Sequence, residues 1–344
     1  MSNHIDAIMN PKSIAVVGAS NRPGSVGNAI ICNLIGSGFQ GVLYPVNPKA
    51  NAIQSIKAYP SLSDIPDEID LAVIVVPSPV VSKVLEEAGQ KGVKGAVVIT
   101  AGFKEIGGKG VEMEEELKAV ARKHDISVIG PNCLGIMNTN PDVSMNASFA
   151  TKMPKRGNIA FISQSGALCT SVLDYAEGRH IGFSKFISFG NKADVNEIDL
   201  LRYLKDDPET DVIIMYLEDI TSGREFLETA REIAWKTKKP MLALKSGRSA
   251  AGAKAAASHT GSLAGSDTAY DAIFLQSGIQ RKDSIKELLD NAVAFAQQPL
   301  PKGNRVAIIT NAGGPGIMAT DAAIRYDLQI AELSEETKKS LLES

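Results

Sequence analysis

The chain has 344 residues, of which 44% are hydrophobic and 22% are charged, and its formal net charge is −3. Because a single core rarely grows beyond ~250–300 residues, this length predicts two or three domains, and the composition excludes a disordered chain. The charge gives no basic excess for nucleic acid, and no apolar run approaches the ~20 residues that cross a bilayer, so we expect neither partner.

The first part of the chain alternates short Val/Ile-rich runs with helical patterns. Continuous apolar runs are typical of parallel strands covered on both faces. These runs are Ile14–Gly18, Gly41–Val46, Leu71–Pro77, Ala96–Thr100 and Val128–Gly130, and helical stretches between them are Gly27–Gly38, Pro79–Lys91 and Val111–His124. The alternation predicts an α/β domain with a doubly wound, Rossmann-like sheet over residues 1–140.

A polar stretch without a clear period, Pro141–Pro154, predicts a break after this domain. A second α/β series follows, with a flavodoxin-like rhythm, and we assign it to a domain of residues 152–298. Its predicted strands are Ile159–Ile162, Phe186–Phe189, Val212–Tyr216 and Pro240–Leu244, and its predicted helices are Ala167–Arg179, Ile198–Asp206, Ser222–Thr237 and Asp267–Ser277. Residues 302–344 repeat the pattern of strand, glycine loop and helix start, which predicts the beginning of a third α/β domain.

The first glycine-rich loop follows a predicted strand and opens a helix. Its first residues are Gly18, Ala19, Ser20 and Asn21. Backbone N–H groups and the helix dipole favour a phosphate in such a place, although the spacing is not G-x-G-x-x-G. An NAD site would have an acidic residue at the end of the next strand, where this chain has Lys49. A cation there suits a phosphorylated ribose, as in NADP or coenzyme A.

Two further strands end in segments that would line the ligand crevice of an open α/β sheet. One segment contains Pro77, and the other contains Thr100 and Ala101. The nearby run Gly102–Lys109 resembles a Walker loop, but its Gly/Lys spacing is wrong, so we do not expect ATP to bind there.

The loop Ser163–Gly166 again lies between a strand and a helix. Ser163, Gln164, Ser165 and Gly166 bring small or polar side chains and free N–H groups, which form a good anion cradle. A simpler interpretation is that one of the serines only caps the helix.

His259 lies in a stretch rich in Ala, Gly and Ser, within the run Ala257–Gly261. A neutral imidazole can attack a phosphoryl group and carry it as phosphohistidine, provided that an acceptor holds its other nitrogen. Glu218, just past a predicted strand, is a candidate for that acceptor, although a charge at a helix N-terminus is the simpler interpretation. Three scattered cysteines fit neither a disulfide framework nor a zinc site, so we expect a reducing cytoplasm and no metal site in this chain.

These motifs together resemble the NDP-forming acyl-CoA synthetases, the superfamily of succinyl-CoA synthetase. The resemblance is closest to the α subunits, or N-terminal halves, of ADP-forming acetate–CoA ligases, and it covers nearly the whole chain. The segments that carry it are Gly130–Gly135, Ser163–Gly166, Glu218, Ser258–Gly261 and Asn311–Gly316.

The resemblance implies a role for each matching position. The Gly18–Asn21 loop, Lys49, Pro77 and the Thr100–Ala101 segment would bind coenzyme A. Asn132 and Cys133 would lie near the thioester, His259 would be phosphorylated, and Glu218 would hold its imidazole. Two helix starts would face the phosphate, one at Ser165 and Gly166 and the other at Gly313 and Gly314.

The family implies that acyl-CoA and phosphate give an acyl phosphate and free CoA, after which His259 passes the phosphoryl group to ADP. The acid is expected to be small, such as acetate. No ATP-grasp pattern is found in the sequence, so we expect ADP/ATP and Mg²⁺ at a partner β subunit or C-terminal region, in a hetero-oligomer. Two other functions remain open, namely a CoA-binding regulatory region of an acetyltransferase fusion and an NADP-dependent oxidoreductase.

Overall fold

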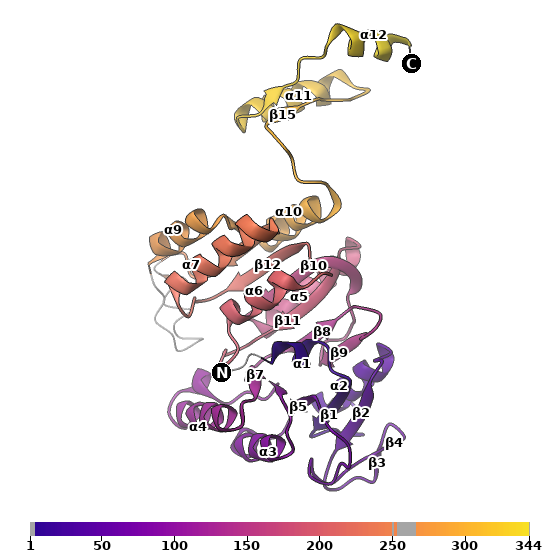
Figure 1. The fold of residues 1–344 in the computed structure, drawn as a ribbon, viewed down its shortest axis with the longest axis vertical. Coiled ribbons are helices and arrows are strands. Elements are labelled where there is room, and N and C mark those ends of the chain that lie inside the picture. The colour runs from indigo at the N-terminus through magenta and orange to yellow at the C-terminus, as the bar shows by residue number, and fades with distance from the viewer. Residues whose placement is uncertain (1–3, 250, 253–265, 344) are drawn as a thin grey trace. The chain divides into compact units, whose positions relative to one another are not determined.

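The fold is seen in a computed structural model that describes residues 4–249, 251–252 and 266–343 (Figure 1). The chain divides into two compact units, Met1–Gln297 and Gln298–Ser344. Within the described ranges, no helix has the length and apolar character needed to span a membrane. The predicted division into domains of residues 1–140, 152–298 and 302–344 includes a boundary within the first of these units, and the division stays a prediction.

The first unit begins with an all-parallel sheet of five strands in the order β2-β1-β5-β6-β7. Its strands are β1 (Ser13–Val17), β2 (Val42–Val46), β5 (Leu71–Ile74), β6 (Gly95–Val98) and β7 (Ser127–Ile129). Along β1, Ile14 and Val16 pack into one apolar cluster, and Ala15 and Val17 pack into another. The sheet is therefore covered on both faces, as the continuous apolar runs predict.

Helices cover this first sheet from both sides. They are α1 (Ile5–Met9) and α2 (Val26–Gly36) on one face, and α3 (Ser78–Gln90) and α4 (Lys109–His124) on the other. A short antiparallel pair, β3 (Ala52–Ile53) and β4 (Ile56–Lys57), follows β2, and a 3₁₀ turn, Lys104–Ile106, precedes α4. The α/β alternation predicted from the sequence is confirmed.

The second sheet has seven strands in the order β14-β13-β12-β10-β11-β8-β9. They are β8 (Gly135–Asn138), β9 (Met145–Ser148), β10 (Lys155–Ser163), β11 (Gly182–Ser188), β12 (Val212–Leu217), β13 (Met241–Lys245) and β14 (Gln280–Arg281). The strands β10 to β14 pair in parallel, whereas β8 and β9 pair antiparallel at one edge.

Helices also cover both faces of the second sheet. One face packs against α6 (Glu197–Asp206), α7 (Gly223–Glu232) and α9 (Asp267–Ser277), and the other against α5 (Gly166–Gly178) and α10 (Ile285–Gln297). The α5 side is built on three rings, Phe161, Phe183 and Phe186, whose centroids lie 4.9–6.5 Å apart. This is the flavodoxin-like arrangement that the second series of strands and helices predicts.

The predicted break Pro141–Pro154 is wrong in its centre, because β9 lies inside it. A search for apolar residues does not find this strand, because its polar residues Asn146 and Ser148 are buried along with Met145 and Ala147. Their polar groups are satisfied locally, since the Ser148 hydroxyl donates to Asn146 Oδ1 at 2.7 Å. In the sequence, a buried polar strand looks like a loop, because the hydrogen bonds that permit its burial form only in the folded chain.

Two smaller differences lie near the end of the first unit. The predicted helix Ser222–Thr237 is α7 followed by a π-helical turn, Ile233–Thr237. The last strand and helix of the unit, β14 and α10, were not predicted from the sequence.

The two sheets of the first unit share one hydrophobic cluster. It contains Ile30 of α2 and Val16 of β1, then Met145 of β9, and it continues to Ile162 of β10 and Leu201 of α6. All five side chains are fully buried. The pair β8–β9 therefore does more than extend the second sheet, because it packs against α2 and joins the two sheets through a common core.

The second unit contains β15 (Arg305–Val306), α11 (Gly313–Arg325), β16 (Gln329–Ile330) and α12 (Glu335–Glu343), and its two strands pair in parallel. The predicted order of strand, glycine loop and helix is found here. Large apolar side chains such as Ile309, Ile317 and Leu341 are exposed in this unit.

The close approach of α2 to the loop after β1 generates a stability prediction. A Cβ at Gly27 would lie 2.1 Å from the carbonyl oxygen of Gly18, whereas a Cβ at Gly36, in the same helix, would meet nothing within 4 Å. We expect Gly27→Ala to lower the free energy of unfolding by about 2 kcal/mol or more, since backbone atoms must move apart. The matched variant Gly36→Ala should raise it by about 0.5–1 kcal/mol, because alanine favours the helix.

Chemical denaturation followed by circular dichroism measures both changes. Equal effects of the two substitutions would contradict the proposed close contact between α2 and the β1 loop.

Candidate functional site

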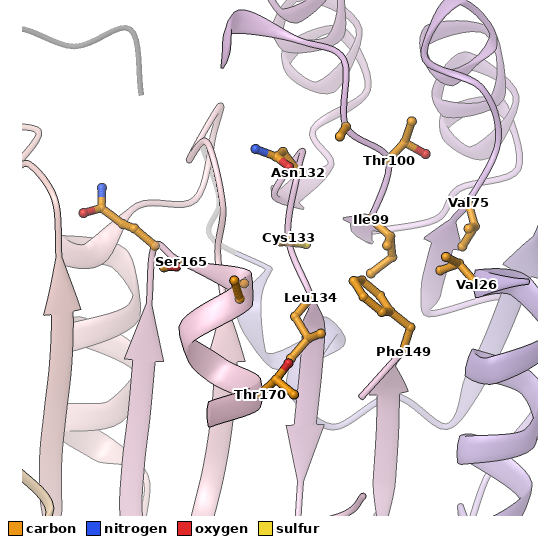
Figure 2. A pocket seen from close by; sticks show the side chains of 14 residues that line it. Val26, Val75, Ile99, Thr100, Asn132, Cys133, Leu134, Phe149, Ser165 and Thr170 are labelled. Atoms are coloured by element: carbon orange, nitrogen blue, oxygen red, sulfur yellow. The ribbon is translucent and has the colours of Figure 1, made fainter. Parts of the chain in front are cut away.

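A cavity of about 550 Å³ lies in the first unit, between the carboxyl ends of β5 and β6 and the start of α5 (Figure 2). Residues of both sheets line it. They are Val26, Val75, Ile99, Thr100, Ala101, Asn132, Cys133, Leu134, Phe149, Gln164, Ser165, Gly166, Ala167 and Thr170. Seven of these positions were predicted as site residues, in three segments that are far apart in the sequence.

The loop after β1 is held in a conformation that glycine favours. Gly18 has φ +95°, and a Cβ there would lie 2.3 Å from the carbonyl oxygen of Val75. The Ser20 hydroxyl accepts a hydrogen bond from the Arg22 N–H, and the Ser20 carbonyl accepts one from the Asn28 side chain. The loop thus keeps its backbone close to the end of β5, as a strand-to-helix phosphate loop does.

Asn47, at the end of β2, ties this loop to the turn that carries Lys49. Its side-chain amide donates to the carbonyl of Ala19 at 2.7 Å, and its Oδ1 accepts the N–H of Lys49 at 2.8 Å. Asn21 reaches the same region, because its amide donates to the carbonyl of Ala52 at 2.9 Å. The structure therefore brings Lys49 beside the Gly18–Asn21 loop, with its side chain exposed.

The Gly18–Asn21 loop and Lys49 are not among the residues that line the cavity, and neither is Pro77, which is exposed directly before α3. The other two CoA-site candidates, Thr100 and Ala101, do line it. The Thr100 hydroxyl donates to the carbonyl of Val76 at 2.7 Å, and its carbonyl accepts the N–H of Asn132 at 2.9 Å. Ala101 follows Thr100 in the cavity wall.

Cys133 lies in the cavity wall as a buried thiol. Its Sγ donates to the carbonyl of Val98 at 3.4 Å, and burial raises the pKa of the thiol to about 12. The neutral thiol is not a nucleophile at physiological pH. Its neighbour Asn132 has φ +59°, and its amide donates to Asn191 Oδ1 at 3.2 Å. These contacts make Cys133 a packing residue, while Asn132 fixes the turn.

The opposite wall is the N-terminus of α5. Ser165 caps this helix by accepting the N–H of Leu168 at 3.3 Å, and the buried Ser163 hydroxyl accepts the N–H of Ser165 at 3.1 Å. Gly166 and Ala167, in the first turn, line the cavity. The helix dipole places partial positive charge at this end, which favours an anion in the cavity.

Gln164 also lines the cavity, but its side chain has protein partners. Its Oε1 accepts the N–H groups of Glu218 and Asp219, and its Nε2 donates to Asp219 Oδ1 at 2.6 Å. Glu218 itself is half-buried directly after β12. The loop Ser163–Gly166, predicted to bind an anion, is therefore hydrogen-bonded through Gln164 to the backbone of Glu218, the predicted carboxylate.

The remaining candidates lie elsewhere. His259 is outside the residues that the structure describes. Gly313 and Gly314 begin α11 in the second unit, where both are exposed.

The sequence analysis missed the apolar wall of the cavity. Figure 2 shows Phe149 and Ile99 facing each other, with Val26 and Val75 close by. Phe149 follows β9, within the predicted break, and is 39% exposed. An aromatic residue in a polar stretch was a usable signal, because ligand pockets are lined predominantly by hydrophobic and aromatic side chains.

Two family models match most of the first unit. Residues 12–139 match a CoA binding domain, and residues 156–295 match the succinyl-CoA ligase like flavodoxin domain. The α/β fold class predicted from the sequence is confirmed.

Three relatives show how far the similarity extends along the chain. The chain is 48% identical over 96% of its length to a 4-hydroxybutyrate–CoA ligase (ADP-forming) of Nitrosopumilus maritimus, and 49% identical over 97% to an acetate–CoA ligase (ADP-forming) of Methanocaldococcus jannaschii. It covers 47% and 46% of these two proteins, so it spans about half their length. It is 50% identical over 98% of its length to the acetate–CoA ligase (ADP-forming) II subunit alpha of Pyrococcus furiosus and covers 72% of that subunit.

A solved structure shows the same fold. The dinucleotide forming acetyl-coenzyme A synthetase 1 of Ca. Korarchaeum cryptofilum, in complex with phosphate and ADP, matches with a TM-score of 0.91 and 43% identity. The match covers 96% of this chain and 70% of that one. The family resemblance read from the glycine loops and the segments around Asn132 and Glu218 is confirmed, and the chain belongs to the family of the ADP-forming acetate–CoA ligases and related acyl-CoA synthetases.

Proposed function

We propose that this chain is the CoA-binding and phosphoryl-carrying part of an ADP-forming acyl-CoA synthetase that acts on a small carboxylic acid. The observation that carries the proposal is the cavity, because it joins the carboxyl edge of a sheet matching a CoA-binding domain to the N-terminus of α5. An acyl thioester and a phosphate need such a meeting point, with an apolar wall for the acyl and thiol ends and helix N–H groups for the anion.

In the first proposed step, a phosphate oxygen attacks the thioester carbonyl of acyl-CoA. The carbon–sulfur bond breaks, CoA leaves as the thiol after taking up a proton, and an acyl phosphate remains. In the second step, a ring nitrogen of His259 attacks the phosphorus and the carboxylic acid leaves as its carboxylate. Glu218 would hold the other ring nitrogen and stabilise the positive charge that develops on the imidazole.

The candidate residues in and near the cavity take distinct parts in this proposal. Lys49 and the Gly18–Asn21 loop would bind the phosphorylated end of CoA, and Pro77, Thr100 and Ala101 would border its arm. Ser165 and Gly166 would hold the phosphate, helped by the α5 dipole. Asn132 would lie beside the reacting thioester, with Cys133 packed behind it.

The proposal includes a nucleotide site outside the described residues of this chain. Relatives that are about twice as long contain further sequence, and one relative is named as a subunit alpha. We propose that an ATP-grasp β subunit or C-terminal region, binding ADP or ATP with Mg²⁺, receives the phosphoryl group from His259. Gly313 and Gly314 would supply a second phosphate-facing helix start. A hetero-oligomer in the cytoplasm fits these parts and stays a prediction.

The position of Lys49 generates a binding prediction. Lys49→Ala should weaken CoA binding about tenfold, roughly 1.4 kcal/mol, because a charge-assisted contact with a phosphate is lost. Lys94→Ala is the matched control, since Lys94 is also exposed but directly precedes β6, at the amino-terminal rather than the carboxyl end of the parallel strands. Titration calorimetry with CoA measures all three affinities, and equal values for Lys49→Ala and the unchanged chain would refute the assignment of Lys49.

The proposed phosphohistidine is tested by labelling. With the ATP-grasp partner and ATP labelled at the γ-phosphate, the chain should acquire acid-labile, base-stable phosphate, and His259→Ala should abolish it together with turnover. CoA affinity should not change, because the CoA loop and His259 belong to different predicted domains. His180→Ala, at an exposed histidine beside Lys155, should leave labelling intact. Labelling of the His259→Ala chain at the normal rate would overturn the proposed role of His259.

A further inference from the structure

Three loops meet at the carboxyl ends of the neighbouring strands β12, β10 and β11 (Figure 1). The loop after β10 supplies Gln164, the turn after β11 supplies Lys192, and the residues directly after β12 are Glu218 and Asp219. Their side chains make a continuous set of contacts around the backbone that carries Glu218. Gln164 and Glu218 were singled out from the sequence, as an anion-binding residue and as the carboxylate for His259, whereas Lys192 and Asp219 were not.

Both ends of the Gln164 amide are engaged by the loop after β12. The oxygen accepts two backbone N–H groups, from Glu218 and from Asp219, the second at 3.1 Å. The nitrogen donates to Asp219 Oδ1 at 2.6 Å. Because the oxygen can only accept and the nitrogen can only donate, these partners fix the orientation of the amide. They also fix the position of the Glu218 backbone relative to the cavity wall.

Lys192 holds Asp219 from the other side. Its Nζ lies 2.8 Å from Asp219 Oδ1 and 3.1 Å from Glu197 Oε2, and its side chain is only 7% exposed. The fully buried Glu197 in turn accepts the N–H of Thr221 at 2.6 Å. Burial would raise the pKa of Asp219, but the Lys192 ammonium and the Gln164 amide hold it below its ordinary value. Asp219 is therefore ionised at neutral pH and keeps both partners.

Stability alone does not explain so many charges in one buried place. A buried ion pair gains little over well-packed apolar side chains of similar size, since desolvation offsets the attraction. The first sheet and the Phe161 side of the second sheet use apolar packing instead. Gln164, Lys192, Glu197 and Asp219, together called the charged brace, lie instead at the strand ends. There Gln164 lines the cavity and also accepts a hydrogen bond from the Glu218 backbone.

We infer that Lys192, Asp219 and Gln164 are positioning residues that set the place of Glu218 for phosphoryl transfer. The inference rests on the proposed function, in which Glu218 holds the imidazole of His259. None of the three needs to touch the reacting atoms, because they act through the backbone of Glu218. Displacement of a catalytic group by about 1 Å can cost ~10²-fold in rate, so a loosened brace should be visible in kinetics.

The test measures the rate of phosphoryl incorporation into the full protein, with its ATP-grasp part, from labelled ATP. Lys192→Met should lower this rate by ~10²-fold, and the loss should appear in kcat with the KM for ATP and the affinity for CoA unchanged. Lys192→Arg should restore most of the rate, because the guanidinium can still bridge two carboxylates.

The matched control is Lys185→Met. Lys185 is also a buried lysine on β11, paired with Asp207 at 3.1 Å, but it lies within the strand, and Asp207 follows α6. Both methionine variants should lower the melting temperature, whereas only Lys192→Met should lower the labelling rate. A parallel loss of rate in Lys185→Met would mark the effect as general destabilisation and overturn the inference.

A double-mutant cycle shows whether the brace acts through Glu218. If it does, Lys192→Met should reduce the rate of a Glu218→Gln protein by no more than a few fold, far less than in the unchanged protein. If the fold-losses of the two single substitutions instead multiply in the double variant, the inference is overturned. If the Lys192→Met protein fails to fold, Asp219→Asn replaces it in the same cycle, because this substitution keeps the shape of the side chain and removes only its charge.

The two proposals fail in different ways. An unchanged protein that acquires no label would overturn the proposed function itself. An unchanged protein that is labelled normally, with Lys192→Met and Asp219→Asn labelled equally fast, would overturn the positioning role and leave the proposed function standing.

Discussion

The whole site depends on one apolar cluster that the two sheets of the first unit share. Val16, Met145 and Ile162 belong to it, and each comes from a different strand. Because close-packed interiors resist small shifts, this core fixes the edge of one sheet against the start of α5 in the other. The cavity needs that rigidity, since its lining comes from both sheets, with Ile99 after β6 of the first and Phe149 after β9 of the second.

The sequence was sufficient for the parts of the fold that follow local rules. Continuous Val/Ile runs predicted the parallel strands, and the rule that ligands meet strand carboxyl ends predicted that Thr100 borders a ligand crevice. Only the structure shows that Thr100 and Ser165, predicted for two separate loops, line the same cavity. The sequence was insufficient where burial reverses the local pattern. Asn146 is buried in β9, where the Ser148 hydroxyl donates to its Oδ1, and Lys192 looks like a surface cation until Glu197 and Asp219 surround it.

Gln164 shows how the place of a residue can be predicted from sequence while its contacts cannot. Its place between a strand and a helix predicted an anion cradle, and it does line the cavity. Its hydrogen bonds, however, go to the backbone after β12 and to Asp219. Under the proposed function, the helix N-terminus at Ser165 and Gly166 would meet the phosphate with backbone groups and the dipole, which need no side chain. The side chain of Gln164 supports the neighbouring loop after β12.

The burial of Cys133 has a consequence for the redox behaviour of the site. A cofactor that ends in a thiol forms disulfides under oxidation, and a neighbouring thiolate would exchange with them to give a mixed disulfide. Burial raises the pKa of the Cys133 thiol to about 12, which keeps the thiol neutral at pH 7. Its sulfur also donates to the Val98 carbonyl inside the wall. Because the thiolate is the attacking species in disulfide exchange, Cys133 is a poor partner for an oxidised thiol cofactor.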